Sequence, residues 1–142
     1  YSREYFFRYA EEFDKRHKDW AMDAILVNIN HFHVINERHG KEYGNQVLRC
    51  IADNIRTLLQ KSEGIACRPE ADTFLIYCPH REDYKAILDN ASMGLAGEQN
   101  ANTRVRLRMG VYSQVDKTLE IDRRFDYAKI AANNVKTGEN RL

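Results

Sequence analysis

Two asparagines, Asn28 and Asn30, follow the apolar run at residues 24–27 and are separated by one position. On a β-strand this spacing places both side chains on the same side, and strand ends in open α/β sheets are frequent sites of ligand chemistry. A hard divalent cation prefers charged oxygen ligands, whereas an amide supplies a neutral oxygen. The pair therefore indicates either a cation site that has lost its charge or two polar residues that cap the following helix.

The stretch CRPEADTF, residues 67–74, lies between two short apolar runs. Apolar residues occupy alternate positions on both sides of it, and this alternation predicts a β-hairpin with its turn near residues 70–73. Asp72 falls in that turn, where aspartate is also a common turn-forming residue.

The hydrophobic pattern predicts the elements that position these groups. Apolar residues at helical spacing predict helices, and short alternating or continuous apolar runs predict strands. The order of elements predicts an α+β fold, with helices packed on a mostly antiparallel sheet. The expected helices are 2–17, 31–38, 42–60, 81–95 and 122–136, the expected strands are 22–28, the hairpin at 65–78 and a strand beginning near Val105, and a polar loop is expected at 97–103.

Length and charge limit the classes of function. The chain has 142 residues, of which 43% are hydrophobic and 30% charged, with a net charge of +1; this fits one domain with a sizeable core. So small a net charge favours neither nucleic acid nor an anionic membrane as a partner. The longest apolar stretch is too short for direct membrane insertion. Because the first residues are already amphipathic, residues 1–142 are interpreted as a single domain excised from a larger protein.

Three cysteines, Cys50, Cys67 and Cys78, lie among apolar residues without a C-x-x-C spacing. We expect buried free thiols in a reducing compartment. A cytoplasmic location follows, either alone or as the cytoplasmic part of a membrane-anchored protein. The five histidines are scattered as surface or loop residues, so a zinc site is not expected.

Five segments in order resemble the GGDEF domain family of bacterial diguanylate cyclases. The start of the family's first helix resembles YSREYF, and its Asp-x-Asp-x-Phe-Lys-x-x-Asn and Gly-Asp-x-x-Leu stretch resembles LVNINHFHVINERHGKEYGNQVL. The family's Arg-x-Gly-Gly-Asp-Glu-Phe hairpin resembles CRPEADTF. Its Ser-x-Gly strand resembles MGVY, and its closing segment resembles GENRL. The resemblance implies a ferredoxin-like, nucleotide-cyclase-like palm, with a central sheet of about five strands flanked by helices. It also implies condensation of two GTP into cyclic di-GMP with two Mg²⁺ ions, where two subunits of a homodimer meet.

Carried over to this sequence, the family's metal and hairpin positions are altered. Asn28 falls at the first metal carboxylate, while Asp72 keeps the position of the metal-binding or catalytic acid. Residual metal binding is therefore expected at Asp72 and Asn28, with Asp72 as a vestigial catalytic residue. Glu70 brings bulk and negative charge to a hairpin where the family has glycine lying against the substrate. The departures from the family pattern are Asn28, Asn30, Glu70, Ala71, Thr73 and Glu139.

The nucleotide contacts implied by the resemblance fall on Phe32, His33, Asn36 and Asn45. Asn36 matches a guanine-contacting asparagine, whereas Asn45 replaces an aspartate that accepts two hydrogen bonds from guanine. Because an amide offers one acceptor and one donor group, this exchange should erode guanine selectivity. His33 replaces a lysine, and Glu139 reverses the charge expected beside a phosphate.

The sequence thus favours a degenerate GGDEF domain without diguanylate cyclase activity. It would be a regulatory or interaction module in cyclic di-GMP signalling, with an adjoining EAL phosphodiesterase or sensor domain as its partner. GTP and Mg²⁺ would bind only if the site still functions. Two alternatives stay open: an active diguanylate cyclase with a divergent motif, and a structural or dimerisation domain that binds no nucleotide.

Overall fold

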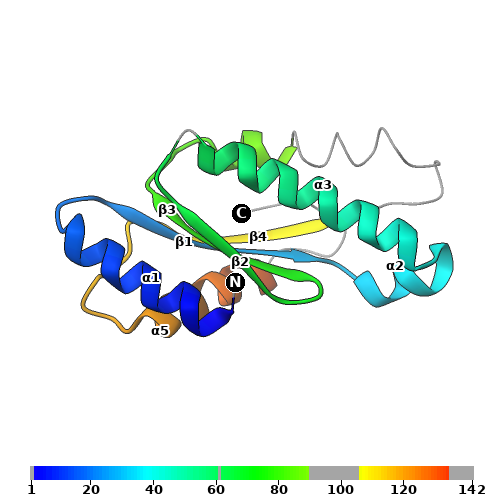
Figure 1. The fold of residues 1–142 in the computed structure, drawn as a ribbon, viewed down its shortest axis with the longest axis horizontal. Helices are drawn as coiled ribbons and strands as arrows, with labels where there is room; N and C mark the ends of the chain where they lie inside the picture. The colour runs from blue at the N-terminus through cyan, green and yellow to red at the C-terminus, as the bar shows by residue number, and fades with distance from the viewer. Residues whose placement is uncertain (1, 61, 90–105, 135–142) are drawn as a thin grey trace.

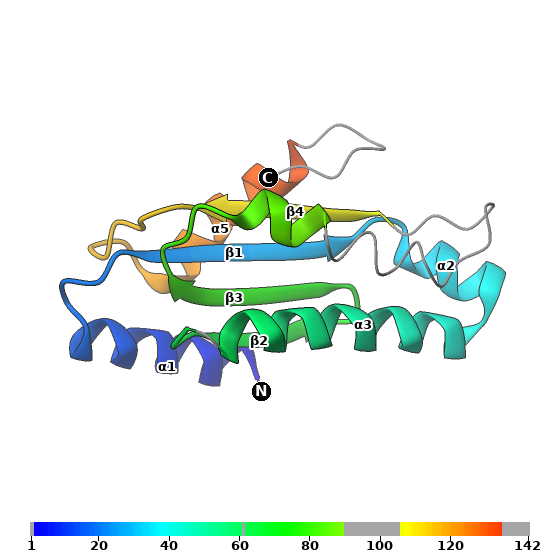
Figure 2. The same cartoon turned by 90° about the horizontal axis from the view of Figure 1, so that it is seen from above.

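The computed structural model describes residues 2–60, 62–89 and 106–134. Within these ranges four strands form one antiparallel sheet in the order β2-β3-β1-β4 (Figure 2). The family resemblance implies a sheet of about five strands, and the described residues contain four. The strands are β1 (Met22–Ile29), β2 (Ile65–Glu70), β3 (Thr73–Pro79) and β4 (Leu107–Tyr112). Each lies close to its predicted position, and the hairpin turn between β2 and β3 falls at residues 71 and 72.

Helices cover both faces of this sheet, as Figure 1 shows edge-on. α2 (Phe32–His39) and α3 (Lys41–Gln60) lie on one side, and α1 (Arg3–Arg16) and α5 (Ile121–Asn133) on the other. A further helical turn spans residues 84–89. The α+β class and helix-flanked antiparallel sheet predicted from the sequence are therefore confirmed. The rest of the helix expected at 81–95, the loop at 97–103 and the closing segment with Glu139 lie outside the described residues.

The alternation of side chains along β1 determines the two cores. Ile25, Val27 and Ile29 pack in the cluster beneath α3, whereas Ala24 and Leu26 pack in the cluster beneath α1 and α5. Both faces are covered, so β1 is a continuous apolar run rather than an alternating one. Asn28, which shares the parity of Leu26, lies on the α1 and α5 side where the strand ends.

Gly110 permits an unusually close approach of α5 to β4. A Cβ atom at this position would lie 1.9 Å from the carbonyl oxygen of Ala128 and 2.5 Å from the backbone nitrogen of Ala132. No side chain fits against backbone at that distance, because real Cβ contacts are longer. The glycine of the MGVY segment therefore sets the spacing between helix and sheet.

Candidate functional site

The carboxyl end of β1 and the hairpin turn bring three predicted site residues together. Asn28 pairs with Thr73 across β1 and β3, and its Nδ2 donates to Thr73 Oγ1 at 3.5 Å. Thr73 in turn donates from Oγ1 to Asp72 Oδ1 at 3.0 Å. The backbone N–H of Ile29 donates to the carbonyl oxygen of Asp72 at 3.0 Å, which fixes the turn against the strand. Asn28, Asp72 and Thr73 therefore form one cluster, which joins the end of β1 to the hairpin turn.

An arginine that the sequence reasoning did not select joins this cluster from β4. Arg108 lies opposite Asn28 in the register of β1 and β4, and its Nη2 donates to Asn30 Oδ1 at 2.9 Å. A guanidinium group thus lies beside two neutral amides. The available signal is the alternation of basic and apolar residues in VRLRMGVY, which is equally typical of a strand with one solvent-facing side.

The alternative that Asn28 and Asn30 cap the following helix is wrong. The N-cap of α2 is His31, whose φ of 56° places it in the left-handed region, and α2 has no side-chain capping hydrogen bond. Asn28 reaches β3 and Asn30 reaches β4 instead. The two side chains link strands, so their positions are set by the sheet rather than by the helix.

The turn itself carries the substitutions Glu70 and Ala71, which are both exposed. The pairing of β2 with β3 shifts between Cys67 and Glu70, after which Glu70 pairs with Thr73. Glu70 therefore places a carboxylate on the exposed surface of the turn, two positions before Asp72.

The predicted base-recognition residues lie on α2 and α3. A Cβ atom at Gly44 would lie 1.9 Å from Asn36 Oδ1, so the Asn36 side chain occupies the space that this glycine leaves. Asn36 Oδ1 is buried and has no hydrogen-bond partner within the described residues. A buried acceptor without a donor is unfavourable by about 1–3 kcal/mol. Asn45 follows Gly44 directly and is exposed.

The other two predicted nucleotide-binding residues, Phe32 and His33, lie in different environments. Phe32 is 7% exposed and belongs to the core beneath α3, with its Cζ atom 3.4 Å from the position of a Gly44 Cβ. It supports the α2–α3 packing from inside. His33 is exposed on the surface of α2.

A groove runs between α3 and the hairpin. A hollow of about 530 Å³ is lined by Asn45, Leu48, Arg49, Ala52, Arg68 and Phe74. It shares Ala52, Arg68 and Phe74 with a second hollow of about 450 Å³ that continues along α3 and β2. Arg49 and Arg68 are exposed at this groove, and Arg49 Nε donates to the carbonyl oxygen of Asn45 at 3.4 Å. The first hollow therefore combines one amide and two guanidinium groups with an apolar floor.

The donor set at the strand end does not fit a pair of Mg²⁺ ions. Such ions bind best to several charged oxygen ligands, and this cluster offers the Asp72 carboxylate, neutral amides and the cationic Arg108. In the part of the chain that the structure describes, no three His, Cys, Asp or Glu side chains are arranged to hold a metal ion.

Among the same residues, no helix has the length and apolarity needed to cross a bilayer.

Comparison with known proteins places this chain in one family. The model for "Diguanylate cyclase, GGDEF domain" matches residues 1–141, and the chain belongs to that family. A curated relative, the diguanylate cyclase VdcA of Vibrio cholerae, is 29% identical over 66 residues, which are 46% of this chain and 19% of that protein. This chain therefore matches about a fifth of the relative's length.

Solved structures agree with the fold. A GGEEF domain of a diguanylate cyclase from Vibrio cholerae superposes with a TM-score of 0.72 at 20% identity, covering 93% of this chain and 88% of that one. The GGDEF domain of DgcB from Caulobacter crescentus, solved in complex with c-di-GMP, gives a TM-score of 0.74 at 15% identity, covering 93% and 80%. At these identities the likeness establishes the fold alone.

Proposed function

We propose that this chain is a degenerate GGDEF domain that lacks diguanylate cyclase activity and works as a regulatory or interaction module in cyclic di-GMP signalling. The observation that carries the proposal is the hydrogen bond from Arg108 to Asn30, beside the neutral Asn28. The family resemblance puts a metal-binding carboxylate at Asn28 and a second aspartate of the same strand at Asn30. Where the resemblance implies two carboxylates, this site has two amides with the guanidinium group of Arg108 beside them.

The electrostatic consequence is large. Two unit charges about 5 Å apart interact by about 3 kcal/mol at an effective dielectric of about 20, and a divalent cation doubles that value. Loss of the carboxylates removes attraction, and the guanidinium of Arg108 adds repulsion. Phosphoryl transfer depends on metal ions that neutralise the developing charge, so this cluster is poorly suited to the reaction.

Weak, metal-independent GTP binding is compatible with the same geometry. Asn36 Oδ1 is a buried acceptor without a partner in the described residues, and a guanine N–H could satisfy it. Asn45 and the two arginines Arg49 and Arg68 line the adjacent groove, where the guanidinium groups could face phosphate oxygens. The exposed carboxylate of Glu70 would oppose a triphosphate and limit its affinity.

The proposed setting is the cytoplasm, within a longer protein that carries an EAL phosphodiesterase or sensor domain beside this one. A regulatory role needs such a neighbour, because a domain without catalysis acts through what it contacts. The proposal includes association of this domain into a homodimer. The family's association with cyclic di-GMP chemistry supports the signalling context.

An activity assay tests the proposal. The protein is incubated with GTP and either Mg²⁺ or Mn²⁺, and cyclic di-GMP is measured by mass spectrometry; none is expected. Product that disappears in Asp72→Ala would contradict the proposal and support the active alternative. Calorimetry with GTP, GDP and ATP is run in parallel without metal. We expect weak binding of guanine nucleotides, whereas no heat with any nucleotide would support a purely structural domain.

A further inference from the structure

A second polar cluster lies at the opposite end of the sheet from the candidate site. Its centre is Asp23, near the start of β1, whose side chain is 0% exposed. The carboxylate accepts hydrogen bonds from Tyr84 Oη at 2.5 Å and from the backbone N–H of Gln114 at 2.7 Å and of Arg81 at 3.2 Å. Its partners come from the connection after β3, from the helical turn at 84–89 and from the loop after β4.

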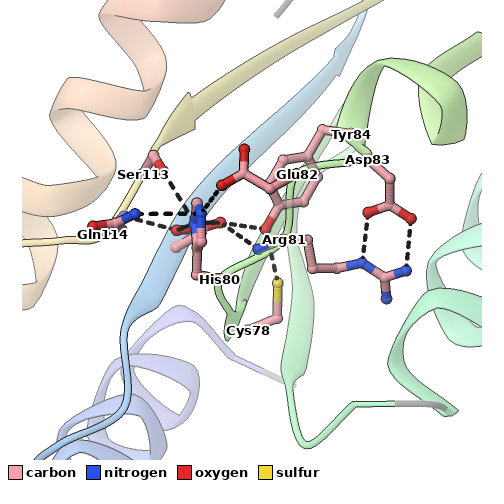
Figure 3. Close-up of polar contacts among 9 residues, drawn as sticks. Cys78, His80, Arg81, Glu82, Asp83, Tyr84, Ser113 and Gln114 are labelled. Atoms are coloured by element: carbon pink, nitrogen blue, oxygen red, sulfur yellow. Dashed lines mark hydrogen bonds and ion pairs between the residues drawn. The ribbon is translucent and has the colours of Figure 1, made fainter.

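His80 lies between this buried carboxylate and an exposed one. Its Nδ1 is 2.9 and 3.0 Å from the two oxygens of Asp23, and its Nε2 is 2.7 Å from Glu82 Oε1. Figure 3 shows Glu82 reaching back to the ring from the same connection. A neutral imidazole donates from one nitrogen only. Both carboxylates are satisfied together only when the ring is protonated.

The two carboxylates differ in how far they can move. The Asp23 side chain is fully buried and held by donors from three segments. The Glu82 side chain is 89% exposed and can turn into solvent. When the ring loses a proton, the hydrogen bond to Asp23 is retained and the one to Glu82 is lost.

A replacement partner for Nε2 is already in place. The side-chain nitrogen of Gln114 is 3.3 Å from His80 Nε2, on the side away from the 80–84 connection (Figure 3). Gln114 has a φ of 50°, which is unusual for a residue with a side chain. Its backbone N–H donates to Asp23 Oδ1 at 2.7 Å, and this bond holds its side chain beside the ring. An amide N–H can donate to the lone pair of a neutral imidazole, whereas a carboxylate cannot.

We propose that Asp23, His80, Glu82 and Gln114 form a proton-operated latch, in which protonated His80 holds Glu82 and neutral His80 exchanges it for the Gln114 side-chain amide. The exchange changes whether His80 Nε2 bonds to Glu82 of its own connection or to Gln114 of the loop after β4. The latch thus couples the proton concentration to the partner of His80 Nε2.

The charged and titratable groups around the ring favour its protonation. Hydrogen bonds to Asp23 and then to Glu82 raise the pKa of His80 above its ordinary value. The neighbouring guanidinium of Arg81 is engaged by Asp83 through two contacts of 2.8 Å. The remaining groups near the ring and Asp23 are neutral. Tyr84 and Cys78 share a 3.5 Å contact next to Asp23. The loop after β4 contributes Ser113, whose Oγ is 3.2 Å from His80 Nδ1, and Gln114.

The sign of the linkage follows from this pKa. A histidine with a raised pKa in the folded state stabilises the fold fully below its unfolded pKa, near 6.5. That contribution is lost progressively as the pH rises through the folded pKa. The exchange of Glu82 for Gln114 as the partner of His80 Nε2 occurs over the same range of pH, as it rises through the folded pKa of His80.

Nuclear magnetic resonance titration of the full chain tests the latch. The imidazole signal of His80 and the side-chain amide of Gln114 are followed with pH, and both should change with one shared midpoint above 6.5. Glu82→Gln should lower the pKa of His80. Asp83→Asn removes a neighbouring carboxylate that binds Arg81 instead, and it should leave the midpoint unchanged.

A third variant separates the latch from simple ion pairing. Gln114→Met removes the partner of the neutral ring and should raise the pKa of His80, opposite to the effect of Glu82→Gln. The proposal is overturned if the Gln114 amide signal does not follow His80, if Glu82→Gln and Asp83→Asn shift the midpoint equally, or if Gln114→Met leaves it unchanged. Glu82 and Asp83 are 89% and 50% exposed, so these variants should fold.

Discussion

Arg108 of β4 donates a 2.9 Å hydrogen bond to the side-chain oxygen of Asn30 at the end of β1. This contact joins two residues 78 positions apart and places a cation where the family resemblance implies carboxylates and metal ions. In our proposal, the charge of the site rather than its shape is what distinguishes this domain from a working cyclase. The contact leads to a direct prediction about metal affinity.

Restoring the charge at the strand end should restore metal binding. The double variant Asn28→Asp with Arg108→Ser adds one anion and removes one cation. Each change favours a nearby divalent ion by several kcal/mol at about 5 Å, so we expect Mn²⁺ to bind more than tenfold tighter than to the unmodified protein. Isothermal titration calorimetry gives the affinity. The matched control is Asn28→Asp with Arg106→Ser, which removes instead the basic residue directly before β4; equal gains in the two proteins would refute the role of Arg108.

Gly44→Ala should disturb base recognition more than stability. The added Cβ would meet Asn36 Oδ1 at 1.9 Å, and that atom ends a flexible side chain, so Asn36 should turn away. Alanine is also favoured over glycine in a helix by about 1 kcal/mol, which offsets part of the strain. We expect weak GTP binding to be lost while the urea midpoint changes little. Unchanged nucleotide binding in the variant would show that Asn36 does not contact the base.

Gly110→Ala should destabilise the fold strongly. The new Cβ would lie 1.9 Å from the backbone oxygen of Ala128, and backbone cannot turn away as a side chain can. Overpacking of this kind costs typically 1–3 kcal/mol. Gly40→Ala is the comparison, because nothing lies within 4 Å of its Cβ and only its φ of 85° opposes the change. Urea denaturation should rank Gly110→Ala as the more harmful; the reverse order would contradict the packing of α5 on β4.

Arg124 of α5 should contribute more stability than its neighbour Arg123. Arg124 is 4% exposed, and its Nη1 donates to Asp14 Oδ2 at 2.6 Å and to Tyr77 Oη at 3.1 Å. Breaking a buried ion pair costs about 3–5 kcal/mol, because the remaining charge is left without its partner. Arg124→Met should therefore lower the free energy of unfolding by several kcal/mol, whereas Arg123→Met, on the exposed side of the helix, should change it little. Similar losses in the two variants would contradict this assignment.

The thiols of Cys67 and Cys78 should resist modification in the folded protein. Burial raises the pKa of each to about 11, so the reactive thiolate is scarce at pH 8. Cys50 is only half-buried and should react first with a thiol reagent. We expect the other two to react after addition of denaturant. Rapid labelling of Cys78 without denaturant would show that the core beneath α3 opens readily.

The sequence predicted those parts of the molecule that depend on local periodicity. The helix at 42–60 corresponds to α3 (Lys41–Gln60), because its apolar stripe recurs at helical spacing over many turns. The hairpin with its turn near residues 70–73 is likewise found as β2 and β3, since its two strands adjoin in the chain. Phe32 was assigned to nucleotide contact but lies in the core; a motif position does not reveal which way a side chain faces.

Contacts between distant segments were beyond prediction from one sequence. Arg108 meets Asn30 only because β4 pairs with β1 in a particular register. Asp23 lies inside an apolar run and His80 was one of several scattered histidines, so nothing local linked them across 57 positions. Such partnerships depend on the sheet topology, which a single sequence does not specify.

The most direct test of the central claim is a diffraction measurement on crystals grown with GTP and Mn²⁺. The anomalous difference map reports bound manganese at the end of β1 without reference to activity. We predict no ordered ion between Asn28 and Asp72, with the Arg108 guanidinium still bonded to Asn30. Two well-occupied manganese peaks coordinated by Asp72 would contradict the account.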